Sequence, residues 1–369
     1  MTRAFSLYLD LLRAVAALSV VIFHLADPRF TVVTYQVVRE MDLGRDAVIL
    51  FFVISGFVIA FCADTKDKTI SGFAFARLTR LISVALPALV LGFLLDAYGA
   101  SSFESFYETR FYNAIPFNEQ LFRGVTFSNE WVWSPIRLGT NGAYWSLSYE
   151  AAYYALFACV FYMRGWLRMG TVILCCAVVG INILLLLPCW LIGVWLYHKS
   201  AAATHRLDPI ILMLLPVGLY IIAHTIALPD MLNDLTIYFV SAEGFLQLRF
   251  SGSAAWNTFL ALLIAAHLLA AHKWFSDDAA QDHALAWPIR KLAQSSFSIY
   301  LFHLPVMNVA KPVLSTHVPV LNNDVGLLSV TIGICLLFAV FFEHTLPWQR
   351  KVLRHLFVDR GGSDAERAP

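Results

Sequence analysis

Two ionisable side chains, Arg13 and His24, interrupt the first apolar stretch of the chain. They are eleven residues apart, which is close to three helical turns and about 16 Å along a helix, so both project from nearly the same face. An ionisable group at membrane depth costs at least about 2–3 kcal/mol unless it is paired or faces water. A fixed cation and a titratable imidazole on one face could bind an anion and accept a proton.

Structural roles are the alternative for both residues. Arg13 can pair with Asp10, three residues earlier on the same helix face, and His24 can be a packing or interfacial histidine. Asp46, at the start of the second apolar stretch, would lie at a level similar to that of His24. A carboxylate beside an imidazole fixes its tautomer and raises its basicity. The alternative for Asp46 is a solvated aspartate at a helix start.

Polar side chains also occur inside later apolar stretches. Glu150 would lie one to two turns into the fourth stretch, and Tyr154, four residues on, shares its helix face. A buried glutamate needs a partner, and an arginine or a histidine is the natural one. His303 is a second histidine at membrane depth, and Pro305 predicts a kink beside it.

Arg77 and Arg80 occupy the segment between the second and third apolar stretches. Arginines three residues apart share a helix face and present two forks that suit phosphate groups. The alternative is the ordinary basic flank of a membrane span. The sequence has no metal-ligand spacing, no P-loop and no dinucleotide-binding glycine pattern, so we expect neither a metal site nor use of a nucleoside triphosphate.

The composition indicates that these side chains are carried by a membrane protein. The chain has 369 residues, of which 59% are hydrophobic and only 14% charged, whereas soluble domains are about half apolar and a quarter charged. Mean hydropathy is +0.68. A net charge of +1 argues against a nucleic-acid binder. The six cysteines include no CxxC pair and are predicted to be buried thiols.

We predict an all-α fold, a polytopic membrane bundle of about ten transmembrane helices. A span needs about 20 mostly apolar residues. The candidates are 8–26, 45–63, 80–97, 144–163, 170–187, 188–198, 208–228, 254–272, 295–316 and 325–343. The fifth and sixth form one apolar run that Pro188 interrupts, so either two short spans meet there or one long helix kinks.

The distribution of Lys and Arg predicts the orientation. With a cytoplasmic N-terminus, most basic residues fall on the cytoplasmic side, as the positive-inside rule requires. Ten spans then place both termini in the cytoplasm. Two long segments, 98–143 and 229–253, fall outside, where they could cap a site or be inert surface. Residues 1–350 are predicted to form a single domain, and 351–369 a cytoplasmic tail that is disordered towards its end.

Six motifs, in order, resemble the acyltransferase-3 family of integral-membrane acyltransferases over residues 6–350. They are LDLLRAVAALSVVIFH at 9–24, DAVILFFVISGFVI at 46–59, RLTRL at 77–81, YWSLSYEAAYY at 144–154, SFSIYLFHLPV at 296–306 and FFEHTLP at 341–347. The resemblance implies transfer of an acyl group, usually acetyl, from cytoplasmic acyl-coenzyme A to a hydroxyl group, usually on a carbohydrate at or beyond the membrane.

The resemblance also implies functions for particular residues. Arg13 and His24 would be essential, Arg77 and Arg80 would contact the donor, and Glu150 is the acidic residue of the fourth-stretch motif. We expect His24 to act as a general base, with Asp46 or Glu150 orienting its imidazole, and Arg13 to hold the donor arm or a phosphate. The predicted substrate-binding residues are Tyr154, Trp145 and His303.

The expected partners are acetyl-coenzyme A as donor, a glycan or glycolipid acceptor such as an exopolysaccharide or lipopolysaccharide, and the bilayer of the cytoplasmic membrane, with no nucleic acid and no metal. One alternative is a transporter or flippase of a glycan or lipid precursor, although the sequence shows no internal repeat. Another is an inactive relative that serves as a scaffold or sensor, against which the presence of Arg13, His24 and Glu150 argues.

Overall fold

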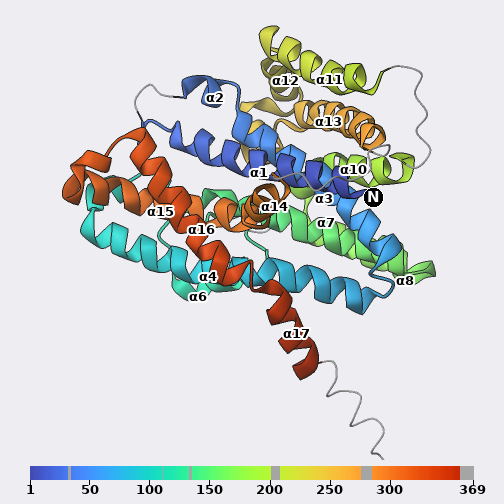
Figure 1. Ribbon diagram of the computed structural model, residues 1–369, viewed down its shortest axis with the longest axis horizontal. Coiled ribbons are helices and arrows are strands. Elements are labelled where there is room, and N and C mark those ends of the chain that lie inside the picture. Colours follow the sequence, from blue (N-terminus) through green and yellow to red (C-terminus); the bar gives the residue numbers. More distant parts are fainter. Residues whose placement is uncertain (32–34, 110, 133–134, 201–207, 276–284, 358–369) are drawn as a thin grey trace, which may run out of the picture.

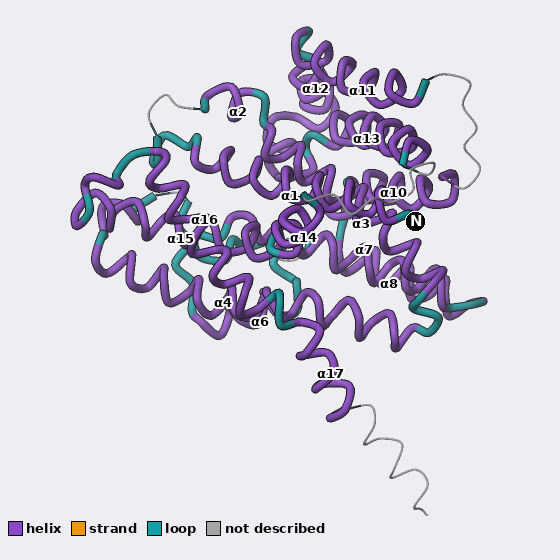
Figure 2. Tube along the Cα trace, viewed as in Figure 1, coloured by secondary structure: helices purple, strands orange, loops and turns teal. Residues whose placement is uncertain are grey.

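The computed structural model of the protein is a bundle of α-helices (Figures 1 and 2). The described residues are 1–31, 35–109, 111–132, 135–200, 208–275 and 285–357. Within these ranges the chain forms helices, turns and loops, with isolated bridges but no β-strand. The predicted all-α class is therefore confirmed for this part of the chain.

The helices follow one another through the whole described chain. The first half contains α1 (Arg3–Leu25), α2 (Gln36–Glu40), α3 (Leu43–Thr65), α4 (Ile70–Ser102), α5 (Glu104–Tyr107), α6 (Phe117–Val125), η1 (Gly142–Tyr144), α7 (Trp145–Tyr162) and α8 (Gly165–Val179). The second half contains α9 (Ile181–Leu185), α10 (Leu187–Ser200), α11 (Pro209–Thr225), α12 (Leu228–Leu248), η2 (Arg249–Ser251), α13 (Ala254–Trp274), α14 (Ala286–Gln294), α15 (Ser296–His317), η3 (Pro319–Leu321), α16 (Asp324–Phe342) and α17 (Leu346–Phe357).

The predicted spans all fall on helices, but length and composition alone support fewer crossings than ten. In the described residues, 6 helical stretches are long and apolar enough to cross a membrane. They are Arg3–Leu25, Leu43–Thr65, Ile70–Ser102, Leu228–Trp274, Ser296–His317 and Asp324–Val352. The apolar helices α8 and α11 are shorter. The chain is thus a multi-pass helical bundle whose number of crossings is not fixed by helix length.

Two segments differ from the sequence prediction. The long apolar run breaks at Gly180, which has a φ of +83°, whereas Pro188 lies in the first turn of α10, where proline is tolerated. Residues 229–253, predicted to be a loop, are largely helix α12. The start of the predicted tail belongs to helix α17, and its end, residues 358–369, lies outside the described ranges, so the predicted disorder there stays a prediction.

Close backbone contact joins α3 to α10 at the centre of the bundle. A Cβ atom on Gly56 would lie 2.1 Å from the carbonyl oxygen of Trp190, and one on Gly193 would lie 2.0 Å from the carbonyl oxygen of Val53. Neither position can carry a side chain without moving the helices apart. Small residues that let helices approach in this way are typical of membrane bundles.

The helices that carry the predicted site residues meet in the middle of this bundle. Figure 1 shows α1 and α3 between a group formed by α11, α12 and α13 on one side and α4, α15 and α16 on the other, with α17 projecting from the bundle. Helix α4 has 33 residues and is about 50 Å long, which exceeds the ~30 Å hydrocarbon core of a bilayer. At least one end of α4 therefore extends beyond the hydrocarbon core. Arg77 and Arg80 lie in the first third of this helix.

Glu130, a buried residue of the loop before α7, pairs with Arg249 of η2 and predicts a pH effect on stability. Glu130 is 4% exposed and its carboxylate lies 3.1 Å from the Arg249 guanidinium. Burial raises the pKa of Glu130 to about 7, against the opposing effects of Arg249 and Arg137. The folded state therefore holds a proton that the unfolded state releases near its ordinary pKa of about 4.3, so this contribution to stability is lost as pH rises through 7.

We expect the melting temperature of the purified protein to fall between pH 5.5 and 8, by an amount equivalent to about 2 kcal/mol from this group. Glu130→Gln should remove that part of the pH dependence, whereas the exposed Glu104→Gln should keep it. Identical pH profiles for the wild type and Glu130→Gln would contradict the assignment. Thermal unfolding across the pH range provides the measurement.

Candidate active site

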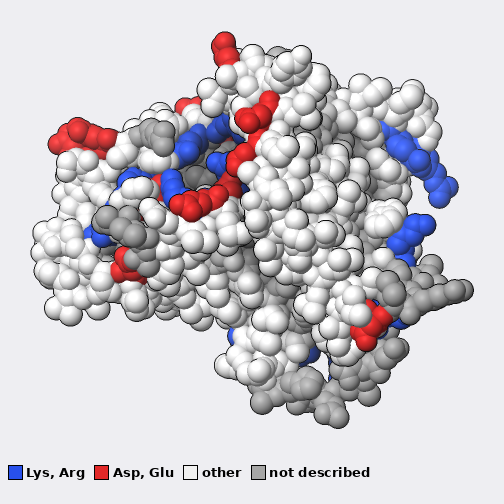
Figure 3. Space-filling model, turned by 90° about the horizontal axis from the view of Figure 1, so that it is seen from above, with Lys and Arg blue, Asp and Glu red and all other residues white. Residues whose placement is uncertain are grey.

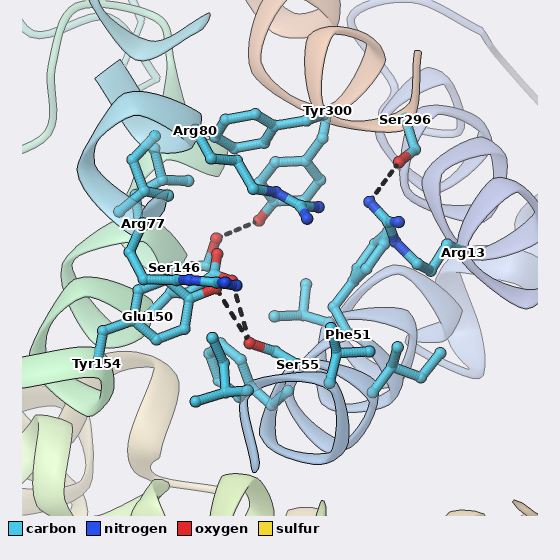
Figure 4. Close-up of a pocket in the computed structure, with 18 residues that line it drawn as sticks. Arg13, Phe51, Ser55, Arg77, Arg80, Ser146, Glu150, Tyr154, Ser296 and Tyr300 are labelled. Carbon is cyan, nitrogen blue, oxygen red and sulfur yellow. Dashed lines mark hydrogen bonds between the residues drawn. The ribbon is translucent and has the colours of Figure 1, made fainter. Parts of the chain in front are cut away.

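Five of the predicted site residues line one cavity of about 830 Å³ between α1, α3, α4, α7 and α15. We call it the arginine cavity because three guanidinium groups reach it (Figure 4). Its polar lining consists of Arg13, Ser55, Arg77, Arg80, Ser146, Glu150, Tyr154, Ser296 and Tyr300. Sequence-distant segments are thus brought together around one cationic space.

The three arginines differ in how strongly the protein itself neutralises them. The Arg77 guanidinium donates to Asp67 at 2.7 Å. Arg13 lies 3.8 Å from Asp10 and donates a long hydrogen bond of 3.4 Å to Ser296. Arg80 has no hydrogen-bond or ion-pair partner for its guanidinium among the residues that the structure describes. Arg80 therefore offers an unpaired cation to an anionic ligand in the cavity.

Glu150 is held by hydroxyl groups and not by the arginine or histidine that the sequence suggested. Its carboxylate accepts hydrogen bonds from Tyr154 and, at 3.1 Å, from Ser55. The indole of Trp190 donates to the same serine at 3.2 Å. Figure 4 shows Glu150 and Arg77 on the same side of the cavity. The carboxylate is thus fixed in the wall of the arginine cavity, where it balances part of the positive charge.

His24 pairs with His303, on α15. The Nδ1 atom of His24 lies 3.1 Å from Nε2 of His303 and 2.9 Å from the carbonyl oxygen of Val20. The Nδ1 atom of His303 faces the carbonyl oxygens of Ile299 and Tyr300 at 3.1 and 2.8 Å. Carbonyl oxygens only accept, so Nδ1 of His303 carries a hydrogen and its Nε2 is an acceptor.

The same reasoning fixes the tautomer of His24. Its Nδ1 faces two acceptors, the Val20 carbonyl oxygen and Nε2 of His303, so it must carry the hydrogen. The other ring nitrogen, Nε2, then has a free lone pair. In a neutral imidazole with this tautomer, Nε2 can take a proton from a substrate hydroxyl.

His24 lines a second cavity of about 860 Å³, which we call the histidine cavity. Its other polar lining residues include Asp27, Arg29, Arg39, Arg45, Arg137 and Thr140. Val48 and Tyr300 line both the histidine cavity and the arginine cavity. A thin wall therefore separates the cationic space from the imidazole.

Asp46 does not orient His24, contrary to the pairing that the sequence suggested. Its carboxylate accepts hydrogen bonds from the Tyr220 hydroxyl at 2.7 Å and the Trp256 indole at 2.9 Å, and lies 3.4 Å from Nε2 of His224. Asp46 thus connects α3 to α11 and α13. The sequence spacing predicts the depth of Asp46 along the bundle axis. It does not predict the direction in which the side chain points around its helix, and Asp46 points towards α11 and α13, not towards His24.

Asp46 and Trp145 line a third cavity of about 1470 Å³, the aspartate cavity. Trp145 stacks on Phe250 with ring centroids 4.1 Å apart and planes 6° apart. Both aromatic residues also line the histidine cavity. Figure 3 shows a hollow edged by acidic and basic side chains on the face that carries α2 and α12. Trp145 therefore lies where the aspartate cavity meets the histidine cavity.

Ser55, Ser296 and Tyr300 were not among the predicted site residues, although all three line the arginine cavity. The Tyr300 hydroxyl is 2.8 Å from Ser146 Oγ and donates to the Ala143 carbonyl oxygen at 3.0 Å. A signal was present for Tyr300, because it precedes His303 by three residues and so shares its helix face. Ser55 lies singly in an apolar run and Ser296 lies among other serines at a helix start, so neither gave a comparable signal.

The comparison with protein families identifies the chain. The acyltransferase-3 family model, described as an acyltransferase domain, matches residues 6–342. The comparisons with curated proteins and with solved structures gave no match. The family match spans nearly the whole chain and agrees with its several apolar helices. The protein therefore belongs to the acyltransferase-3 family and is a multi-pass membrane acyltransferase.

Proposed function

We propose that the protein transfers an acetyl group from cytoplasmic acetyl-coenzyme A to a carbohydrate hydroxyl of a cell-surface or exported glycan. One observation carries the proposal. A cavity with three arginines shares a wall with a cavity that contains an imidazole whose Nε2 is free to accept a proton. An anionic thioester donor and a hydroxyl acceptor require these two environments side by side.

The arginine cavity suits the donor. Coenzyme A carries phosphate groups, and guanidinium forks bind phosphate through paired, charge-assisted hydrogen bonds. Arg80 is unpaired among the described residues, while Arg77 and Arg13 add positive charge on either side. Arg13 and His24 lie on one helix about 16 Å apart, a distance that the extended pantetheine arm can cover. Glu150 and Tyr154 would position this donor site and do not act on the acceptor.

In the proposed reaction, Nε2 of His24 takes the proton of the acceptor hydroxyl as its oxygen attacks the thioester carbonyl carbon. The new carbon–oxygen bond forms and the carbon–sulfur bond breaks. The coenzyme A thiolate leaves and takes the proton from the His24 imidazolium, which restores the neutral base. The products are an acetyl ester and free coenzyme A. His303 is a positioning residue in this scheme, because its Nε2 lies beside the hydrogen on Nδ1 of His24 and favours the reactive tautomer.

Tyr300 is the proposed donor to the developing oxyanion. Its hydroxyl group is the polar end of the wall that the two cavities share, where the thioester carbonyl would meet the acceptor. Ser146 and the Ala143 carbonyl oxygen hold this hydroxyl before the reaction. A positioned donor at a developing negative charge is usually among the largest contributions to catalysis.

The proposal includes a topology of ten spans with both termini in the cytoplasm, in the cytoplasmic membrane. The shorter helices α7, α8, α10 and α11 would be crossings in addition to the longer ones. This orientation places the end of α4 that carries Arg77 and Arg80 on the cytoplasmic side. It places the mouth of the aspartate cavity on the opposite side, where an exported glycan would be present.

Calorimetry with acetyl-coenzyme A on the purified protein tests the donor site. Arg80→Ala should weaken binding about 10- to 150-fold, because a hydrogen bond to a charged group contributes about 1.5–3 kcal/mol. Arg77→Ala should have a smaller effect, since Asp67 already neutralises that side chain. Arg168→Ala, at an exposed arginine of α8, should leave the affinity unchanged.

Two results would contradict the proposal. Unchanged affinity in Arg80→Ala would remove the arginine cavity as the donor site. Absence of saturable acetyl-coenzyme A binding to folded protein, with coenzyme A as a second ligand, would instead favour a transporter or flippase of a glycan or lipid precursor.

A further inference from the structure

The aspartate cavity contains buried polar groups that nothing in the described chain satisfies. Asn257 is 6% exposed, lines the cavity, and makes no side-chain hydrogen bond within the described residues. The side-chain oxygen of Asn233 is buried without a hydrogen-bond partner there, whereas Nε2 of His224 faces the Asp46 carboxylate at 3.4 Å. Buried polar groups are normally hydrogen-bonded. Two amides that line one space, those of Asn233 and Asn257, are therefore available to a polar ligand.

These groups come from separate helices and are held in place by their neighbours. Asn233 belongs to α12, Asn257 to α13 and His224 to α11. The Trp256 indole, beside Asn257, donates to Asp46, and His224 packs edge-on against Trp256 with ring centroids 5.1 Å apart. The polar set is thus built on a fixed scaffold and not on a loop.

The charges at this cavity disfavour an anionic ligand. Its two arginines are already paired, Arg39 with Asp27 and Arg45 with Asp42, each at 3.1 Å. Glu40 and Asp230 also line it, are exposed, and have no partner in the described part of the chain. The unpaired charge at the mouth is therefore negative. A carboxylated or phosphorylated ligand would be repelled, whereas a neutral one would not.

We propose that the aspartate cavity binds a neutral sugar unit of the acceptor glycan, next to the unit that is acetylated. Amide side chains offer one donor group and one acceptor, and vicinal sugar hydroxyls complement both. The part of the cavity that a water-sized group can occupy is about 560 Å³, within the ~300–1,000 Å³ of typical small-molecule pockets, so it has room for a sugar unit. This inference rests on the proposed function, because it assigns part of the acceptor site.

Continuity of the cavities leads the acceptor to His24. Phe23, Arg39, Arg45, Trp145 and Phe250 line both the aspartate cavity and the histidine cavity. A glycan with one unit held by Asn233 and Asn257 can extend past Trp145 towards the imidazole. The subsite would then select the glycan by a unit that does not react, while His24 acts on the neighbouring hydroxyl.

Protection of an introduced cysteine from a maleimide tests the subsite without acetyl-coenzyme A. Ser253 lines the cavity and is part-buried, so Ser253→Cys is a conservative reporter. The probes are D-glucose, D-galactose, D-mannose and L-rhamnose, compared with D-glucuronate and D-galacturonate. At least one neutral sugar should slow labelling about 2- to 10-fold, the factor 1 + [L]/Kd for a weak ligand. Peptide mapping separates the reporter from the native cysteines.

The matched control is Met231→Cys, an exposed position of α12 outside the cavity lining, where no sugar should protect. In the Ser253→Cys protein, the addition of Asn257→Ala or Asn233→Ala should each weaken the affinity for the protecting sugar about 2- to 10-fold. Each variant must keep the melting temperature of its parent. These substitutions lie outside the arginine cavity, so acetyl-coenzyme A affinity should stay unchanged.

Three outcomes would overturn the subsite. They are protection by the uronates but not by neutral sugars, protection by no sugar, or equal protection of Met231→Cys. Failure of donor binding in calorimetry would contradict the proposed function instead. The two failures are distinguishable because the labelling assay contains no donor and requires no turnover.

Discussion

Replacing His24 with alanine should lower acetyl transfer about 10²- to 10⁴-fold, the usual contribution of a positioned general base. The reason is geometric. Nδ1 of His24 faces two acceptors, the Val20 carbonyl oxygen and Nε2 of His303, so Nε2 is left to take the hydroxyl proton. The measurement is transfer of radiolabelled acetyl from acetyl-coenzyme A to the glycan fraction of membranes that contain the protein.

Binding measurements separate catalysis from folding in this variant. Acetyl-coenzyme A affinity should stay near that of the wild type in His24→Ala, since His24 does not line the arginine cavity. His303→Ala should lower the rate of acetyl transfer less, about 10-fold, because the Val20 carbonyl oxygen still favours the same tautomer of His24. His198→Ala, at an exposed histidine of α10, should have no effect. Full activity in His24→Ala, or parallel loss of donor binding, would contradict the general-base assignment.

The helices could be predicted from the sequence wherever an apolar run was long. Helix α12 was missed because Asp230, Asp234 and Glu243 interrupt its apolar residues, and a hydropathy pattern cannot distinguish a polar helix from a loop. Pro188 suggested the break between the fifth and sixth spans, but proline fits the first turn of α10. Gly180 supplies the break instead, through a backbone conformation that favours glycine.

Contacts between the predicted site residues could be predicted within one helix but not between helices. Contacts within one helix follow from spacing, and the predicted proximity of Glu150 and Tyr154 is present. Contacts between helices depend on rotation about each axis, which spacing does not encode. His303 lies 279 residues from His24, and only the packing of α1 against α15 brings them together. For the same reason Asp46 was assigned to the wrong histidine.

Tyr300→Phe should lower the rate of acetyl transfer about 10²- to 10³-fold, the typical cost of removing one oxyanion donor. The substitution deletes only the hydroxyl, which lies in the wall shared by the arginine and histidine cavities. Because the oxyanion exists only during the reaction, the loss should fall on kcat and leave acetyl-coenzyme A affinity within about 2-fold of the wild type. Calorimetry and the radiolabel assay together give both quantities.

Two further variants make this result specific. Tyr149→Phe deletes the hydroxyl of another buried tyrosine, one that hydrogen-bonds to Ser251 and lines none of the three cavities. This variant should keep its activity. Ser146→Ala removes a hydrogen-bond partner of the Tyr300 hydroxyl but leaves the Tyr300 hydroxyl itself in place. It should therefore lower the rate of acetyl transfer by no more than about 10-fold. If Tyr300 only separates the two cavities, the Tyr300→Phe protein should retain its kcat, because the phenyl ring still fills the wall. A loss confined to kcat would therefore show that the Tyr300 hydroxyl donates to the oxyanion and that the side chain does more than separate the two cavities.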